Sequence, residues 1–260
     1  MKSWASLALL FSALSAFSAV KCFAADPAKP DAKDQPKIVV AVPLGLPPGK
    51  PTKLVLRGLK LDEATEVRVH DPKGTARILG KRKTPLANKE KDDLPRYGDT
   101  QVEVEVTLSA DWAGASVPFT VVTPAGESPP HLVLIDHEPV LPEKEPNNGF
   151  RNAQPVTVGQ TIEGVVNPDA DVDVYRFDGK EGQQIVLEVL AARHGSPLDS
   201  MLTLYDADGR IVAANDDCDG SPDSRIEATL PRTGTYFVAL VDADDIGSTA
   251  NVYRLTIRAK

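Results

Sequence analysis

The sequence predicts an all-β protein made of two β-sandwich domains in tandem. Short runs of β-branched and aliphatic residues recur along the chain, and its 22 prolines and 18 glycines punctuate them. No segment of the mature chain shows helical periodicity over more than about two turns. A length of 260 residues suits two domains, since domains commonly hold about 100–150 residues.

Residues 1–25 read as a secretory signal peptide. Lys2 precedes an apolar run from Trp4 to Val20, and small residues follow near position 24. A retained membrane anchor is the first alternative, but about 17 apolar residues is the lower limit for a bilayer span. A lipid anchor on Cys22 is the second, although Lys21 stands where a lipoprotein signal takes a small residue. We expect an exported protein, periplasmic or extracellular, with no integral membrane span after cleavage.

Residues 26–36 form a polar, proline-containing segment, which predicts a disordered spacer. Residues 37–138 follow as the first domain, expected to be immunoglobulin-like. Its strands are expected at residues 38–42, 53–56, 66–70, 101–108, 117–122 and 132–135. The strand at 101–108 alternates valine or leucine with glutamate or threonine, the pattern of a half-buried strand. The lysine-rich and arginine-rich stretch at 73–95 is expected to be a solvated loop.

Residues 139–150 contain P-V-L-P-E-K-E-P, which predicts a proline-rich linker. Residues 151–260 form the second, more acidic domain, expected to be jelly-roll-like. Turn pairs such as Asp208-Gly209 and Asp219-Gly220 separate its runs. Strands are expected at residues 161–166, 172–177, 184–191, 201–205, 211–214, 224–230, 234–242 and 251–258.

Five motifs follow one another through the second half of the chain. They are E-K-E-P-N-N at 143–148, D-A-D-V-D-V-Y-R-F at 169–177, L-T-L-Y-D-A-D-G at 202–209, N-D-D at 215–217 and G-T-Y-F-V-A-L-V at 234–241. In this order they resemble the bacterial pre-peptidase C-terminal (PPC) domain, a β-sandwich appended to secreted proteases and found in clostridial collagenases. The resemblance implies an accessory module, some members of which bind calcium or extracellular polymers.

The first domain has a looser resemblance. G-L-K-L-D-E-A-T-E-V-R-V at 58–69 and V-V-T-P-A-G-E-S at 121–128 resemble an IPT/TIG immunoglobulin-like module. No peptidase domain accompanies the PPC resemblance in this sequence, a departure from the family that argues against a protease-linked role.

Two rows of oxygen donors are the candidate metal site. Asp169, Asp171 and Asp173 are spaced two apart, so on a strand their carboxylates would share one face. Glu143, Glu145 and Asn147 have the same spacing, and calcium takes six to eight such oxygens. The alternative is that these acids are simply solvated.

The resemblance assigns the rows to a calcium site in two arms. Glu143, Glu145, Asn147 and Asn148 would form one arm, with Asp171 and Asp173 as the other. Asn148 is neutral where family members also carry a carboxylate. The full predicted ligand set is Glu143, Glu145, Asn147, Asn148, Asp169, Asp171 and Asp173, with calcium as the cofactor.

The catalytic inventory is poor, and no catalytic residue is predicted. His70, His131, His137 and His194 show no metalloprotease spacing, and Ser196 lacks the glycines of a nucleophile elbow. The formal charge of −8 argues against nucleic-acid binding, which needs clustered lysine and arginine. We therefore expect no enzyme and no nucleic-acid partner.

The sequence thus predicts an exported, non-enzymatic accessory protein, stabilised by calcium, that engages an extracellular or envelope protein or polysaccharide. The alternative is a structural cell-envelope component that assembles with itself or with other envelope proteins. Cleavage of the signal would leave Cys218 alone, either buried, sequestered or available for an intermolecular disulfide. The identity of the partner and the oligomeric state are not encoded in any motif.

Overall fold

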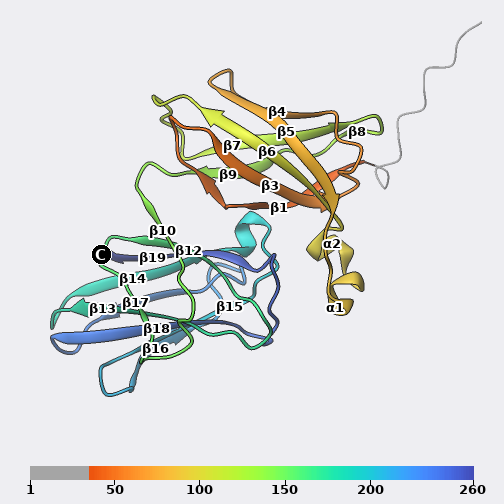
Figure 1. Ribbon diagram of the computed structural model, residues 1–260. Helices are drawn as coiled ribbons and strands as arrows, with labels where there is room; N and C mark the ends of the chain where they lie inside the picture. Colours follow the sequence, from red (N-terminus) through yellow and green to blue (C-terminus); the bar gives the residue numbers. More distant parts are fainter. Residues whose placement is uncertain (1–34) are drawn as a thin grey trace, which may run out of the picture.

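The computed structural model describes residues 35–260, and the predicted signal peptide and most of the spacer lie outside the described residues. Two β-sandwiches lie one against the other (Figure 1), which confirms the predicted fold class. Within the described residues, none of the helices has the length and apolar character that crossing a bilayer requires.

The first sandwich consists of two mainly antiparallel sheets packed around one hydrophobic core. One sheet has the order β1 (Lys37–Val42), β3 (Thr52–Leu59), β6 (Thr100–Leu108) and β5 (Gly74–Lys83). The other has the order β2 (Gly45–Leu46), β9 (His131–Ile135), β7 (Ser116–Thr123) and β4 (Glu66–Val69), with β8 (Gly126–Glu127) paired to β7. The alternation predicted for residues 101–108 is real, because Val102, Val104 and Val106 are fully buried in this core.

The charged stretch at 73–95 is not the loop that we expected. It forms strand β5 and two one-turn helices, α1 (Asn88–Lys91) and α2 (Leu94–Tyr97). Charged side chains are compatible with β5 because it is an edge strand with one solvated face. On that face Arg77 forms an ion pair of 2.9 Å with Glu105 of β6. Local charge therefore misled the prediction, and the cross-strand partners explain the strand.

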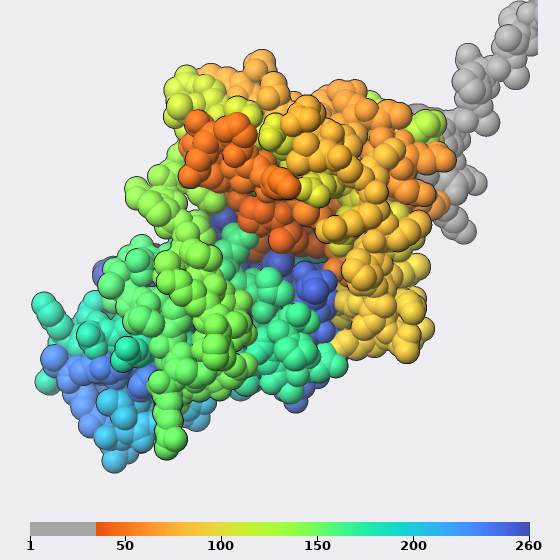
Figure 2. All heavy atoms as spheres, viewed as in Figure 1, coloured from red at the N-terminus to blue at the C-terminus, as the bar shows by residue number. Residues whose placement is uncertain are grey.

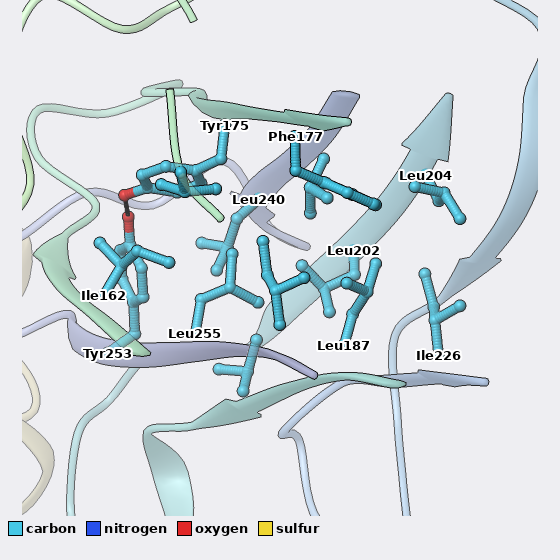
Figure 3. Packing of buried hydrophobic residues seen from close by; sticks show 14 of the residues in the cluster. Ile162, Tyr175, Phe177, Leu187, Leu202, Leu204, Ile226, Leu240, Tyr253 and Leu255 are labelled. Atoms are coloured by element: carbon cyan, nitrogen blue, oxygen red, sulfur yellow. Dashed lines mark hydrogen bonds between the residues drawn. The ribbon is translucent and has the colours of Figure 1, made fainter. Parts of the chain in front are cut away.

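The second sandwich also has two sheets. The first has the order β10 (Val140–Pro142), β12 (Thr161–Val165), β19 (Val252–Ala259), β14 (Gln184–Leu190) and β17 (Arg225–Thr229). The second has the order β11 (Gln154–Pro155), β13 (Asp173–Gly179), β18 (Gly234–Asp242), β15 (Ser200–Tyr205) and β16 (Ile211–Asn215). A 3₁₀ turn, η1 (Ala192–His194), follows β14. Figure 3 shows the aliphatic and aromatic core between these sheets.

Part of the predicted linker belongs to the second sandwich. Strand β10 lies within residues 139–150 and pairs in parallel with β12, where Leu141 is opposite Ile162. Leu141 also packs against the hydrophobic core of that sandwich. The prolines confine β10 to the edge of its sheet, where a missing N–H costs little.

The two sandwiches share an interface (Figure 2). A separate apolar cluster joins Val40, Leu44 and Tyr97 of the first domain to Ala250 and Val252 of the second. Helices α1 and α2 extend along the second sandwich (Figure 1), and the Arg96 guanidinium donates a 2.5 Å hydrogen bond to the carbonyl of Pro197. The orientation of the domains is therefore fixed by packing as well as by the connecting segment.

Candidate metal site

The segment 143–148 follows edge strand β10 and crosses the start of β13. The backbone N–H of Val174 donates to the Asn147 carbonyl at 3.0 Å, and the N–H of Lys144 donates to Gln154 Oε1 at 2.7 Å. These bonds hold an otherwise irregular segment against the sandwich. As a result, its side chains face the first residue of β13, Asp173.

Three carboxylates meet at this crossing. Glu143, Glu145 and Asp173 each offer one oxygen, and these oxygens lie within 4.8 Å of one another. Asp173 is fully buried, Glu143 is half-buried and Glu145 is exposed, so the cluster runs from the domain interior to solvent. Two ligands of one calcium ion, each at about 2.4 Å, can span such a separation.

Asn147 also belongs to this cluster. It is fully buried, and its side-chain N–H donates to Glu143 Oε1 at 3.0 Å. Its Oδ1 atom has no hydrogen-bond partner among the described residues, and neither does Oδ1 of Asp173. Buried oxygens are rarely left unpaired, because the desolvation cost of each is about 1–3 kcal/mol.

Two tyrosine hydroxyls are the remaining neighbours. Tyr253 donates to Asp173 Oδ2 at 2.7 Å, and the hydroxyls of Tyr175 and Tyr253 lie 2.5 Å apart (Figure 3). Tyr253 is also 3.2 Å from Glu143 Oε1. These hydroxyls satisfy part of the acidic cluster without neutralising it.

The pKa shifts reflect this lack of a counter-charge. Burial, together with the hydrogen bond and charge of Glu143, raises the pKa of Asp173 to about 10. Burial also raises the pKa of Glu145, and the charges of Asp171 and Glu143 add to the rise. Burial and the charges of Asp173 and Glu143 raise the pKa of Tyr175. Each shift has the sign expected for acids gathered in a partly dry site.

Comparison with known proteins identifies the domain that holds this cluster. The family described as the bacterial pre-peptidase C-terminal domain matches residues 171–241, which include Asp171, Asp173 and Tyr175. The second sandwich is a PPC domain. This confirms the resemblance seen in the sequence motifs, whereas the resemblance of the first domain to an IPT/TIG module stays a prediction.

A curated relative extends over both domains. It is named "probable subtilase-type serine protease" of Deinococcus radiodurans and is 32% identical over 212 residues. The match covers 78% of this chain, and the chain spans only 28% of the relative's length.

Two solved structures show fainter likenesses. The pre-peptidase C-terminal domain of a Bacillus anthracis collagenase is 18% identical, with a TM-score of 0.34, over 41% of this chain and 94% of its own. The Bacteroides ovatus glucan-utilisation protein SGBP-B, solved with a mixed-linkage heptasaccharide, is 9% identical, with a TM-score of 0.28, over 80% of this chain and 74% of its own. Likenesses at this level assign no ligand to the present chain.

The PPC domain brings together some of the predicted ligands and separates others. Glu143, Glu145, Asn147 and Asp173 lie in one cluster. Asn148 and Asp171 lie beside it and are bonded to each other, with the Asn148 amide 2.8 Å from Asp171 Oδ1. The other Asp171 oxygen accepts the N–H of Asn167 at 2.8 Å, so this carboxylate also shapes the loop before β13.

Asp169 lies apart from the cluster. The expected row of three aspartates on one strand is wrong, because β13 begins only at Asp173 and Ala170 has a positive φ of 58°. Asp169 forms an ion pair with Lys89 of α1 in the first domain, and it accepts the N–H of Gly247 of its own domain at 2.8 Å.

The residues that enclose the cluster were not predicted as site residues from the sequence. Tyr175 and Tyr253 are core residues of the second sandwich, and their hydroxyls also reach the carboxylates. Gly164 of β12 is equally specific, because an added Cβ would lie 2.5 Å from the Tyr253 hydroxyl and 2.9 Å from Glu143 Oε2. The D-V-Y spacing, which puts Asp173 and Tyr175 on one strand face, was the available signal for the first tyrosine.

Two other acidic clusters have structural roles or stay unassigned. Asp242 is buried and accepts the N–H groups of Asp244 and Ile246, both at 3.0 Å, so it shapes its own loop. Asp216 and Asp217 are exposed. Cys218 is a half-buried free cysteine, and its backbone pairs with that of Ser221 in an isolated antiparallel β-bridge.

Proposed function

We propose that this chain is an exported, non-enzymatic accessory protein whose PPC domain binds calcium and which engages an extracellular or envelope protein or polysaccharide. Glu143, Glu145, Asn147 and Asp173 would hold the ion, with Asn148 and Asp171 at its margin. The supporting observation is the pair of buried, unpartnered oxygens, Asn147 Oδ1 and Asp173 Oδ1, inside a group of three carboxylates.

The donor chemistry fits calcium. Carboxylate and amide oxygens are the ligands that this ion takes at six to eight coordination, and the cluster contains no thiol or imidazole that would favour zinc. A cation would supply the counter-charge that burial makes necessary around Asp173. Since Glu143 and Glu145 come from the connecting segment and Asp173 from β13, the ion would fasten that segment to the PPC domain.

The accessory role rests on the PPC domain itself and on the relative of which the chain spans a part. That relative is named a protease, but its name covers a much longer protein. Export is supported by the predicted signal peptide and by the attachment of PPC domains to secreted enzymes. Binding of a protein or polysaccharide partner is the role that such an appended sandwich would serve.

A thermal melt of the mature protein in millimolar calcium, in magnesium and in EDTA tests the metal site. Calcium at about 100 times its dissociation constant would add about 2.7 kcal/mol to the free energy of unfolding. For a chain of this size the expected rise in Tm is about 5–10 °C. Calcium and EDTA curves that coincide would contradict the proposal.

Matched variants assign that rise to the site. Glu145→Gln removes one exposed ligand and should abolish most of the calcium response while leaving the Tm in EDTA nearly unchanged. Glu181→Gln changes an equally exposed acid on the same domain and should respond to calcium as the natural sequence does. An equal loss in both variants would indicate a nonspecific effect of charge.

Limited proteolysis tests the fastening of the segment. Lys144 is exposed and lies between two proposed ligands, so trypsin should cut after it several-fold more slowly in calcium than in EDTA. Cleavage after an exposed lysine of the first domain, such as Lys73 in the turn before β5, provides the internal control. Unchanged cleavage at Lys144 would contradict the mechanical role of the ion.

A further inference from the structure

A second site lies between the two domains. A cleft of about 500 Å³ opens between edge strands β2 and β10, with β12 and β19 on its inner side. Its walls are aliphatic and come from both domains, and they include Val42, Pro43, Val140, Val165 and Val252. Ligand pockets commonly have volumes of about 300–1,000 Å³ and often lie at domain junctions.

The floor of this cleft is charged. Arg254 of β19 forms ion pairs of 2.6 Å with Asp136, which follows β9, and of 2.7 Å with its cross-strand neighbour Glu163. All three side chains are largely buried, with exposures of 6%, 10% and 16%. The guanidinium lies directly over Gly45, where an added Cβ would approach it to 2.5 Å.

Each nitrogen of the Arg254 guanidinium is directed to a carboxylate. Arg254 directs Nε to Glu163, and both of its terminal nitrogens to Asp136. The backbone N–H of Leu44 donates to the second oxygen of Glu163 at 2.9 Å. The carboxylates retain lone pairs, so the floor offers acceptors to a ligand.

The charge of the cleft is also unbalanced. Asp136 and Glu163 face a single Arg254, and Glu138 and Lys50 add one charge of each sign at the rim. Burial raises the pKa of Glu163 against the attraction of Arg254, with Asp136 adding to the rise. Burial opposes the charge of Arg254, but its two carboxylate partners outweigh burial and raise its pKa. A raised pKa favours the neutral form of Glu163 and the charged form of Arg254, as expected where two acids share one cation.

We propose that this cleft binds an aliphatic ammonium group, with the alkyl chain against the valine and proline walls and the ammonium at the free lone pairs of Asp136 and Glu163. A small alkylamine and the lysine side chain of a partner protein share this chemistry. A cation with an apolar chain is favoured because the walls are aliphatic while the floor holds an excess negative charge.

The side chains of the cleft and those of the acidic cluster lie on opposite faces of the β12–β19 pair. Glu163, Val165, Val252 and Arg254 lie on the outer face of the β12–β19 pair, whereas the neighbouring Gly164 faces Tyr253 and the metal cluster on the inner face. The backbone N–H of Val165 donates to Glu143 Oε2 at 2.9 Å, so saturating calcium keeps the acidic cluster in one state while the cleft is titrated. Calcium binding and ammonium binding are measured with different ligands, so failure of one proposal is distinguishable from failure of the other.

The test is an NMR titration of the full mature chain with hexylammonium chloride, in saturating calcium. Saturable shifts are expected in the amides of Val140, Val165 and Val252. Hexanol and hexanoate serve as matched probes and should bind about tenfold more weakly, since they lack the positive charge. Nα-acetyl-lysine methylamide distinguishes the sources: tighter binding than hexylammonium favours a lysine side chain, and weaker binding a free amine.

Variants at the floor and rim complete the test. Glu163→Gln should reduce the preference for hexylammonium over hexanol by about tenfold, while hexanol binding stays the same. If that variant folds poorly, Glu138→Gln and Lys50→Met at the solvated rim should weaken and strengthen ammonium binding, respectively, by a few-fold. Equal binding of hexylammonium and hexanol, or shifts that do not centre on the cleft, would overturn the proposal.

Discussion

Strand β12 separates two groups of carboxylates that are chemically alike and electrostatically different. On its outer face Glu163 and Asp136 surround Arg254, with nitrogen–oxygen distances of 2.6–2.7 Å. On its inner face Glu143 and Asp173 approach the hydroxyl of Tyr253, without a cationic side chain among the groups that shift the pKa of Asp173. The chain thus supplies a cation at the domain interface and only hydrogen bonds at the edge of the PPC domain.

This difference indicates how each group serves the fold. Charges removed from water are tolerated only when they are paired. At the interface Arg254 is the partner of Asp136 and Glu163, so these acids need no cation from solution. The inner group lacks such a partner and is stable in its ionised form only with a cation from solution. The interface should therefore hold with or without calcium, whereas the segment 143–148 should respond to the metal.

The largest expected effect is at the interface. Arg254→Met leaves Asp136 and Glu163 buried without their cation and should lower the free energy of unfolding by about 3–5 kcal/mol. Urea unfolding measures this loss, which calcium should not recover. Arg258→Met on the same strand is the control, because Arg258 is exposed and its removal should cost little. A small loss for Arg254→Met would mean that the interface does not depend on its ion pairs.

The next effect sharpens the other half of the comparison. Asp173→Asn replaces the buried carboxyl with an uncharged amide of the same shape, and the raised pKa of Asp173 already keeps this carboxyl uncharged without a cation, so stability in EDTA should change by no more than about 1 kcal/mol. The calcium increment of about 2.7 kcal/mol at 100 times the dissociation constant should disappear. Titration calorimetry with calcium checks the same point directly. Undiminished binding would remove Asp173 from the ligand set.

Acid should weaken the interface through His131. Burial, with the nearby His194, lowers the pKa of His131 to about 4, and its Nε2 is buried without a partner among the described residues. The unfolded chain takes up this proton near pH 6.5, so stability should fall as pH drops from about 6.5 to about 4. The loss should be about 2 kcal/mol, after allowance for partial exposure.

His131→Gln isolates this contribution from the carboxylates that titrate in the same range. Urea unfolding of both proteins in EDTA, at pH 7 and at pH 4.5, should show a smaller decrease for the variant. The difference between the two decreases is the measured quantity. Equal decreases would assign the acid sensitivity to other groups.

The smallest effect is expected at Asp169. Its ion pair with Lys89 is largely exposed, with side-chain exposures of 62% and 36%, and such pairs contribute about 0–1 kcal/mol. Asp169→Asn should therefore change both stability and calcium affinity only slightly. A loss of calcium affinity as large as that of Asp173→Asn would return Asp169 to the metal site.

The sequence predicted the strands well because their burial is written in local alternation. Strand β6 is one such case, with Val102 and Val104 inside and Glu103 and Glu105 toward solvent. The charged strand β5 was missed because its partners, such as Glu105, lie about 30 residues further along the chain. Propensity is a local property, whereas an edge strand is stabilised by neighbours that only the fold provides.

The candidate site shows the same division. Motif order and oxygen chemistry were sufficient to predict Glu143, Glu145, Asn147 and Asp173 as members of one cluster. Asp169 is separated from the cluster by the turn at Ala170, which has a positive φ. The two-residue spacing of Asp169, Asp171 and Asp173 assumes a continuous strand and could not predict this turn. The contributions of Gly164 and Tyr253 depended on strand register, which brings residues 164 and 253 opposite each other.

The sequence by itself determined two β-sandwiches, the PPC family of the second and the oxygen-rich segment that precedes it. Each of these depends on residue type and short-range spacing. Only the tertiary structure decided which acids share a site, which of them receive an arginine and where a cleft forms between the domains. Burial and the distance between charges control these outcomes, and both arise when segments far apart in the chain pack together.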